Sequence, residues 1–167
     1  MTMKKYFQLV TEGDTADLDI YGDIASWSWS GGNISAANLS RQLEELGDVS
    51  QINVHINSYG GEVAEGLAIY NALRRHKAKV VTTCDGFACS IASVIFMAGD
   101  ELLMSKASLL MIHNAWTSAY GVNANDLRKL AEDMDAITAR SKAAYLDRVS
   151  IGEDELSALM DAESWIS

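Results

Sequence analysis

The sequence contains no proline in its 167 residues, although an average usage of about 5% would give roughly eight. Cysteine is also rare: Cys84 and Cys89 are the only two, and they lack the CxxC spacing of zinc ligands. We therefore expect two small buried residues and neither a disulfide framework nor a metal site. The longest hydrophobic run, residues 87–98, is too short to span a bilayer, and the N-terminus lacks the hydrophobic segment of a signal peptide. These absences predict a cytoplasmic protein without a membrane segment.

Positive charge is scarce as well, with 13 Lys and Arg against 23 Asp and Glu and a formal net charge of −10. Such a surface repels phosphate backbones and anionic lipids, so we expect no binding to nucleic acid or membranes. Hydrophobic residues make up 49% of the chain, which excludes an intrinsically disordered protein. No linker or internal repeat divides the sequence, which predicts a single domain over residues 1–167.

Hydrophobic periodicity predicts alternating strands and helices. Ser35 is the expected N-cap of the first helix, Gly47 its end, and Gly86 a turn between a strand and a helix. The pattern predicts strands over 18–21, 52–56, 79–84, 101–104 and 109–112, and helices over 36–46, 62–75, 89–98 and 123–148. The last helix carries an apolar stripe that includes Leu127 and Tyr145. Repeated strand–helix–strand units predict an α/β fold with a largely parallel sheet.

Ser90 lies where a strand gives way to a very apolar helix, between Ala88 and Ala92. A nucleophile on such a sharp turn needs small neighbours, and the start of the helix offers backbone N–H groups to a developing oxyanion. Serine is equally a favoured N-cap residue, so a purely structural role is the alternative.

A nucleophilic serine needs a base, and the chain has three histidines. His113 follows an apolar strand, at the end of a sheet where sites of α/β proteins gather. A core histidine would give the same pattern. His55 is interpreted as a surface or interface residue and His76 as a solvated one.

The pair Gly60-Gly61 follows a strand and precedes a helix, where glycine allows close approach and leaves N–H groups available for an anion. No phosphate-binding glycine motif is present, and a simple tight turn is the alternative.

Three segments in this order resemble the signature segments of the Clp protease proteolytic subunit (ClpP) family: Ile56-Asn57-Ser58-Tyr59-Gly60-Gly61, Gly86-Phe87-Ala88-Cys89-Ser90-Ile91-Ala92-Ser93 and Met111-Ile112-His113-Asn114. The chain is most similar to phage-encoded, ClpP-like head maturation proteases. The resemblance implies an α/β fold of the ClpP/crotonase type, with repeated strand–helix units, a largely parallel sheet and a long helix in the C-terminal half. It also implies a serine endopeptidase that needs no metal or organic cofactor.

The resemblance assigns a role to each site residue. Ser90 would be the nucleophile and His113 the general base, and the backbone N–H groups of Gly61 and Ile91 would form the oxyanion hole. The family's acid precedes an aromatic–aliphatic–Ser segment, which Trp165-Ile166-Ser167 matches, so the third triad member would be Glu163. Asp161 is its rival.

The chain departs from the family pattern in several places. Tyr59 and Ala115 stand where the family often has proline, and Trp27-Ser28-Trp29-Ser30-Gly31-Gly32 is interpreted as an insertion. The chain stops at Ser167, before the closing helix and strand that the family usually has, which leaves a C-terminal truncation open.

The family also implies partners: peptide or protein substrates, further copies of the chain in a homo-oligomeric ring, and either an ATP-dependent unfoldase or phage capsid and scaffold proteins. Two other functions remain open at this point, a non-catalytic ring or scaffold module and a crotonase-like acyl-CoA enzyme. An α/β-hydrolase with Asp100 as the acid is disfavoured, because a separation of ten positions between nucleophile and acid leaves little room for crossover elements.

Overall fold

The computed structural model describes residues 7–27 and 34–167. Most of the tryptophan-containing insertion therefore lies outside the described residues. The chain forms two compact units, the first made of residues 1–111 and 165–167 and the second of residues 112–164. The single-domain organisation stays a prediction.

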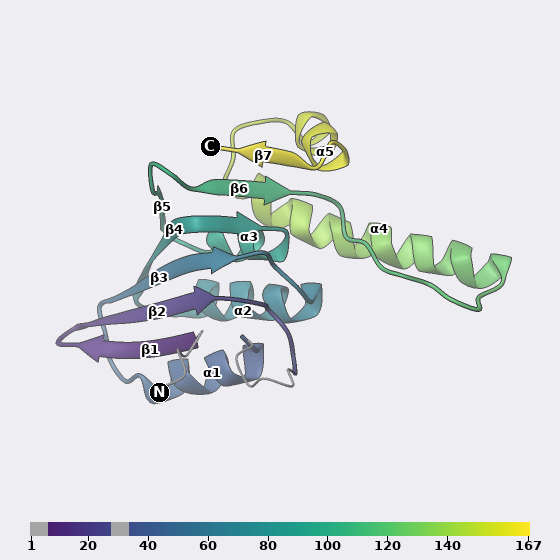
Figure 1. Cartoon of the computed structure of the whole chain (residues 1–167). Helices are drawn as coiled ribbons and strands as arrows, with labels where there is room; N and C mark the ends of the chain where they lie inside the picture. Colours follow the sequence, from purple (N-terminus) through teal and green to yellow (C-terminus); the bar gives the residue numbers. More distant parts are fainter. Residues whose placement is uncertain (1–6, 28–33) are drawn as a thin grey trace. The chain divides into compact units, whose positions relative to one another are not determined.

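The sheet contains seven strands, in the order β1-β2-β3-β4-β6-β7, with β5 paired to β4 (Figure 1). Strand β1 is antiparallel to β2, whereas β2, β3, β4, β5 and β6 pair in parallel. This confirms the predicted α/β class with a largely parallel sheet. The strands are β1 (Phe7–Glu12), β2 (Thr15–Tyr21), β3 (Gln51–Ser58), β4 (Lys79–Cys89), β5 (Glu101–Met104), β6 (Leu109–Ile112) and β7 (Ser164–Ile166).

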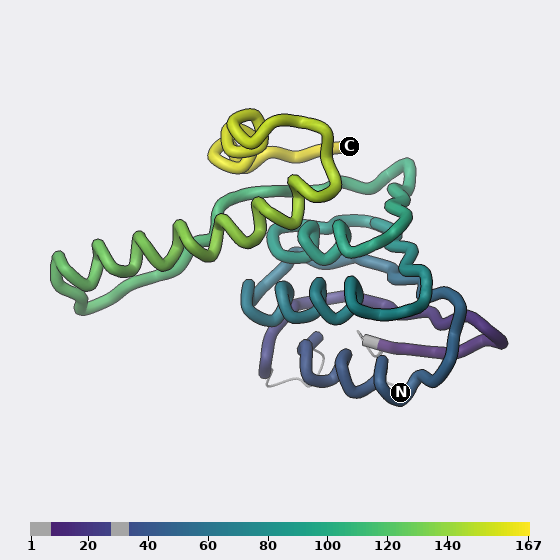
Figure 2. Tube along the Cα trace, turned by 180° about the vertical axis from the view of Figure 1, so that it is seen from behind, coloured from purple at the N-terminus to yellow at the C-terminus, as the bar shows by residue number. Residues whose placement is uncertain are grey.

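Three helices cover one face of this sheet: α1 (Ala36–Glu45), α2 (Val63–Arg75) and α3 (Ile91–Phe96) (Figures 1 and 2). Every second residue of β2 and β3 is buried, as expected for strands with one face against helices. The side chain of Ser35 caps α1 by accepting a hydrogen bond from the N–H of Asn38, as predicted. The core of this unit includes Leu18, Ile20, Leu39, Ile52, Ile56, Ile69, Leu73 and Ile95.

The second unit contains the long helix α4 (Ala124–Leu146) and the short helix α5 (Glu153–Asp161). A capping box between Asn123 and Asp126 begins α4. The buried residues of α4 are Ser141, Ala144 and Tyr145, near its C-terminal end. The predicted apolar stripe is therefore buried only near the C-terminal end of the helix, and Leu127, near the N-terminal end, is half exposed.

The predicted turn at Gly86 is wrong, because β4 continues to Cys89 and α3 begins only at Ile91. A Cβ at Gly86 would lie 2.6 Å from Oδ1 of Asn57, on the neighbouring strand. The glycine thus allows close approach beside an irregularity in the β3–β4 register. Strand β1, helix α5 and strand β7 were not predicted.

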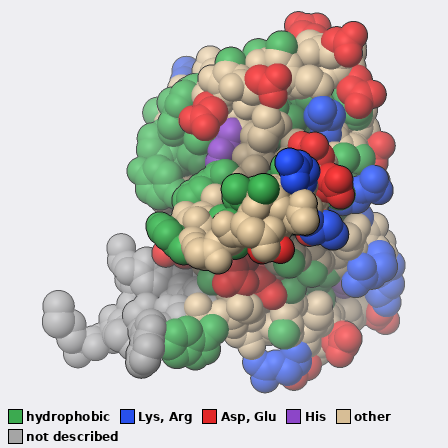
Figure 3. Space-filling view, turned by 90° about the vertical axis from the view of Figure 1, so that its right-hand side faces the viewer, with side chains coloured by type: hydrophobic (Ala, Val, Ile, Leu, Met, Phe, Trp, Pro, Cys, Tyr) green, Lys and Arg blue, Asp and Glu red, His purple; other side chains and the backbone are tan. Residues whose placement is uncertain are grey.

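On the face drawn in Figure 3, acidic and basic side chains of the described residues are interspersed between hydrophobic areas. Within residues 7–27 and 34–167, no helix combines the length and the apolar composition needed to cross a membrane.

Candidate active site

Ser90 lies on a sharp turn between β4 and α3 with a strained backbone. Its φ of 54° and ψ of −129° make it one of two described non-glycine residues with positive φ. A non-glycine residue in such a conformation costs about 1–3 kcal/mol and is found mostly at functional sites. The side chain makes no capping hydrogen bond to α3. The simple N-cap interpretation is therefore wrong, and the strained turn is the geometry expected of an exposed nucleophile.

Neighbouring groups hold the backbone of Ser90 on both sides. Its N–H donates to the carbonyl of Met111 at 2.8 Å, and its carbonyl accepts from the N–H of Ser93 at 3.0 Å. The hydroxyl of Ser93 lies 2.6 Å from the Ser90 carbonyl and 3.2 Å from the Met111 carbonyl. Ser93 is fully buried and was not singled out from the sequence. The sequence feature that could have indicated its role is a single hydroxyl side chain within an otherwise apolar helix.

Replacing Ser93 with alanine should slow the chemistry at Ser90 more than it disturbs the fold. The hydroxyl of Ser93 shares one hydrogen between two carbonyls, and each carbonyl keeps a backbone N–H donor. Its loss should lower the free energy of unfolding by about 0.5–1.5 kcal/mol. The strained turn also loses one of the hydrogen bonds that hold it. An increase of about 1.4 kcal/mol in the activation free energy slows a reaction tenfold, so we expect labelling of Ser90 by a fluorophosphonate to slow about tenfold or more.

The matched control is Ser108→Ala, because this buried hydroxyl also donates to the carbonyl three residues earlier, at 2.8 Å, but has no contact with Ser90. It should lose stability and keep the labelling rate. Equal labelling rates in Ser93→Ala and the wild type would contradict a positioning role for Ser93.

The glycine loop after β3 lies directly against the Ser90 turn. Gly60 has a φ of 98°, and a Cβ there would lie 2.7 Å from the carbonyl oxygen of Cys89 and 2.8 Å from Cβ of Ser90. Gly61 has a φ of 150°, and a Cβ there would meet the carbonyl oxygen of Ile24. Both positions thus require glycine for conformation and for space.

Two polar side chains at the end of β3 fix this loop. The buried hydroxyl of Ser58 donates to the carbonyl of Gly22 at 2.6 Å and accepts from the N–H of Gly60 at 3.0 Å. Oδ1 of Asn57 accepts from the N–H of Phe87 at 3.1 Å, where the β3–β4 register shifts. The signature segment 56–61 therefore attaches the glycine loop to both neighbouring strands.

The two expected oxyanion donors lie in this part of the first unit. The bridge between Ile24 and Gly61 uses the carbonyl of Gly60 and the N–H of Glu62, so it does not use the N–H of Gly61. Ile91 is the first residue of α3, where backbone N–H groups lack a partner within the helix. A Cβ at Gly60 would lie 3.2 Å from the nitrogen of Ile91, so the glycine keeps the space beside that N–H open.

The other predicted site residues belong to the second unit. His113 is half-buried and follows β6 directly. Its neighbour Asn114 donates from Nδ2 to Oδ1 of Asp161 at 2.7 Å. Glu163 is exposed and is the other non-glycine residue with positive φ, at 50°. A cavity of about 320 Å³ in this unit is lined by polar groups that include Asn114, Thr138, Lys142 and Asp161.

The remaining two histidines occupy different surroundings. Nδ1 of His55 lies 3.1 Å from Oδ2 of Asp85, which also accepts a 2.7 Å hydrogen bond from the hydroxyl of Tyr21. Burial, followed by the hydrogen bond to Asp85, raises the pKa of Tyr21 to about 12. His55 is therefore part of a hydrogen-bonded cluster rather than a plain surface residue.

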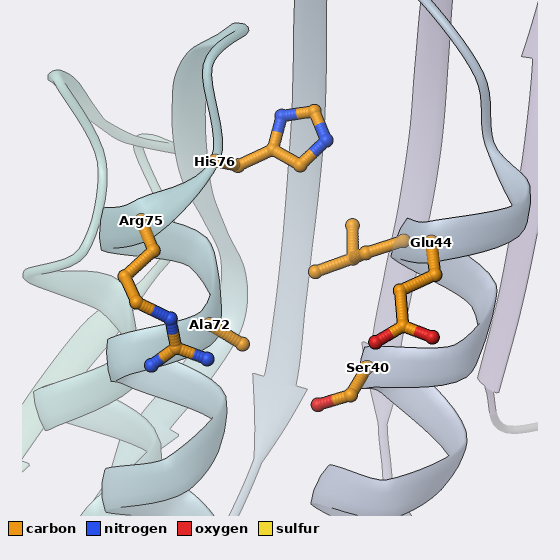
Figure 4. A pocket seen from close by; sticks show the side chains of 6 residues that line it. Ser40, Glu44, Ala72, Arg75 and His76 are labelled. Carbon is orange, nitrogen blue, oxygen red and sulfur yellow. The ribbon is translucent and has the colours of Figure 1, made fainter.

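His76 borders a small hollow of about 170 Å³ between α1 and α2 (Figure 4). Ser40 and Glu44 come from α1, and Ala72 and Arg75 from α2. Burial, followed by the charge of Lys77, lowers the pKa of His76, and its Nδ1 accepts from the N–H of Ala78. His76 was expected to be solvated and is instead half-buried.

Both cysteines are free and buried, as predicted. Burial raises the pKa of each thiol, so both are protonated at neutral pH. Cys89 is therefore a poor nucleophile although it directly precedes Ser90.

Comparisons with known proteins find similar chains in one family. The family model described as Clp protease matches residues 33–167. The chain is 32% identical over 127 residues to the ATP-dependent Clp protease proteolytic subunit of Deinococcus radiodurans, covering 75% of this chain and 62% of that protein. It is 33% identical over 131 residues to the protein of the same name from Bacteroides fragilis, with 72% and 63% covered. The chain thus spans less than two thirds of the length of these relatives.

Proposed function

Because the chain belongs to the Clp protease family, we propose that it is a serine endopeptidase that cleaves peptide bonds through an acyl-enzyme on Ser90. The observation that carries the proposal is the strained backbone of Ser90 beside a glycine loop that can approach it closely. Oγ of Ser90 attacks the scissile carbonyl while His113 takes the hydroxyl proton. The N–H groups of Gly61 and Ile91 stabilise the resulting oxyanion.

The tetrahedral intermediate collapses as the C–N bond breaks, and His113 donates its proton to the leaving amine. A water molecule then attacks the acyl carbonyl while His113 accepts its proton. The ester bond between the acyl carbon and Oγ breaks, His113 returns the proton to Oγ of Ser90, and the carboxylic acid product leaves. Chain connectivity supports the role of His113. Met111 accepts a hydrogen bond from the Ser90 N–H, and two residues span at most about 7 Å, so the chain keeps the His113 backbone near that point.

We propose Glu163 as the acid that orients His113, because its positive φ is the kind of strain found at functional sites. Chain connectivity supports this role too. Glu163 lies two residues before Trp165, whose ring contacts Phe87 of β4. The rival Asp161 already accepts a hydrogen bond from Asn114.

Replacing Glu163 with glutamine should therefore reduce kcat by about a thousandfold or more, as loss of a triad acid does. Asp161→Asn serves as the control, and we expect it to reduce kcat by less than about tenfold, since it weakens one exposed hydrogen bond. Both rates are measured with one fluorogenic peptide. A larger loss in Asp161→Asn would assign the acid to Asp161 instead.

We further propose that the protein assembles into a homo-oligomeric ring through α4. Most of the first half of this helix is exposed in the single chain, together with the large side chains of Trp116, Tyr120 and Leu127. Exposed apolar side chains that gather into a patch mark interaction sites. An ATP-dependent unfoldase is the proposed partner, since the similar proteins are named ATP-dependent. Phage capsid or scaffold substrates and a cytoplasmic location stay predictions.

Incubation with an unfolded protein such as casein tests the proposed activity. Mass spectrometry should show internal cleavage products that appear with the assembled protein and not with a buffer control. An assembled, well-folded preparation that leaves casein and short peptides intact would contradict the proposal.

A further inference from the structure

Three aromatic rings of the first unit form a contiguous strip beside the Ser90 turn. The ring centroids of Tyr59 and Phe87 are 5.6 Å apart, and those of Phe87 and Trp165 are 5.7 Å apart. We call these three residues the aromatic strip. Tyr59 is 70% exposed and Trp165 is 53% exposed, whereas Phe87 is half-buried between them.

The backbone connections of the strip fix its position relative to the proposed nucleophile. Tyr59 directly precedes Gly60, which approaches Cβ of Ser90 so closely that it has no room for a side chain. Phe87 lies three residues before Ser90 on β4, and its N–H donates to Oδ1 of Asn57, at the end of β3 just before Tyr59. The strip is therefore attached to β4, which leads into the Ser90 turn, and to the glycine loop that lies against this turn.

The exposure of the two outer rings is not explained by folding. Large apolar side chains stabilise a fold when folding buries their surface. More than half of the surface of Tyr59 and of Trp165 stays exposed. The rings nevertheless hold each other in tilted and edge-to-face contacts, which reduces the entropy lost when a further apolar group packs on them. Exposed apolar patches that are rigid and lie beside a candidate site are typical of ligand-binding surfaces.

We propose that the aromatic strip binds a large aromatic or aliphatic side chain of the peptide substrate and thereby sets the cleavage preference. This inference rests on the proposed peptidase function. A peptide whose scissile carbonyl reaches Ser90 and the N–H of Gly61 extends by about 3.3 Å per residue. A side chain within two residues of the scissile bond can therefore reach Tyr59, whose backbone is bonded to Gly60. Tyr59 stands where the resembled family often has proline, so this ring is a feature of the present chain.

The test compares two fluorogenic peptides that differ only by Phe or Ala at positions within two residues of the cleaved bond. The wild type should prefer the Phe peptide in kcat/KM, and Tyr59→Ala should reduce that preference about fivefold to tenfold, in line with the strength of aromatic pairs. Tyr59→Phe should keep the preference. Leu103→Ala removes a side chain with 43% exposure on β5 and is the control for general loss of apolar surface.

A binding measurement separates failure of the strip from failure of the proposed chemistry. Ser90→Ala protein is titrated with the same two peptides, and it should bind the Phe peptide more tightly. Adding Tyr59→Ala should remove this difference. If peptides bind in this way but the wild type never cleaves them, the proposed peptidase function is wrong, whereas the inference that the aromatic strip binds a large side chain holds.

Two results would overturn the inference. The first is an equal reduction for both peptides in Tyr59→Ala, which would mean that Tyr59 only supports the Gly60 loop. The second is a change in the mass of the assembled particle in Tyr59→Ala together with equal loss of both activities. That result would make the strip a contact between copies of the chain.

Discussion

Replacing Ser90 with alanine should abolish peptide hydrolysis, with a loss in kcat of about 10⁵- to 10⁶-fold, because no other group can form the acyl-enzyme. The fold should remain, since the backbone contacts of Ser90 to Met111 and Ser93 do not use its side-chain oxygen. A fluorophosphonate should add once per chain to the wild type, as measured by intact mass, and not at all to Ser90→Ala.

The control is Ser150→Ala, which removes the hydroxyl of an exposed serine in the second unit and should leave labelling unchanged. Labelling that persists in Ser90→Ala would sink the nucleophile assignment. Cys89 would then be no better candidate, because burial raises the pKa of its thiol and keeps it protonated.

Features that depend on neighbouring residues could be predicted from the sequence. The alternation of buried residues in β3 and the Ser35 cap of α1 follow from local rules, and the structure has both. The position of Ser90 at the junction of strand and helix also follows from a local pattern of small residues. The strand–helix alternation then leads to the parallel sheet through the chirality and shortness of connections.

Features that depend on distant residues could not be predicted. Gly86 indicated a turn because glycine often breaks strands, but its role is to admit Asn57 from the neighbouring strand. Ser93 gained its significance from the carbonyl of Met111, 18 residues later. The aromatic strip joins residues from three separate segments, and no periodicity relates them. The fold class alone also left an acyl-CoA enzyme open, and family membership favours the protease.

Gly60→Ala should also cause a large loss of activity, because a methyl group there cannot fit against the Ser90 turn. Its Cβ would lie 2.7 Å from the Cys89 carbonyl oxygen and 2.8 Å from Cβ of Ser90, so the loop or the turn must move. Either movement displaces the N–H of Gly61 or that of Ile91 from the proposed oxyanion position. Loss of one such donor costs about 10²- to 10³-fold in kcat, and we expect at least that loss.

Gly47→Ala separates this steric effect from backbone strain, because Gly47 also has positive φ, at 73°, but no atom within 4 Å of an added Cβ. Backbone strain should cost each variant about 1–2 kcal/mol of stability, and the clash at Gly60→Ala adds to this cost. Only Gly60→Ala should lose activity, and peptide hydrolysis with urea unfolding of both variants measures the difference. Since the conformational cost is shared, a loss of rate confined to Gly60→Ala must come from its contact with the Ser90 turn. Equal kcat values in the two variants would mean that the glycine loop does not take part in the chemistry.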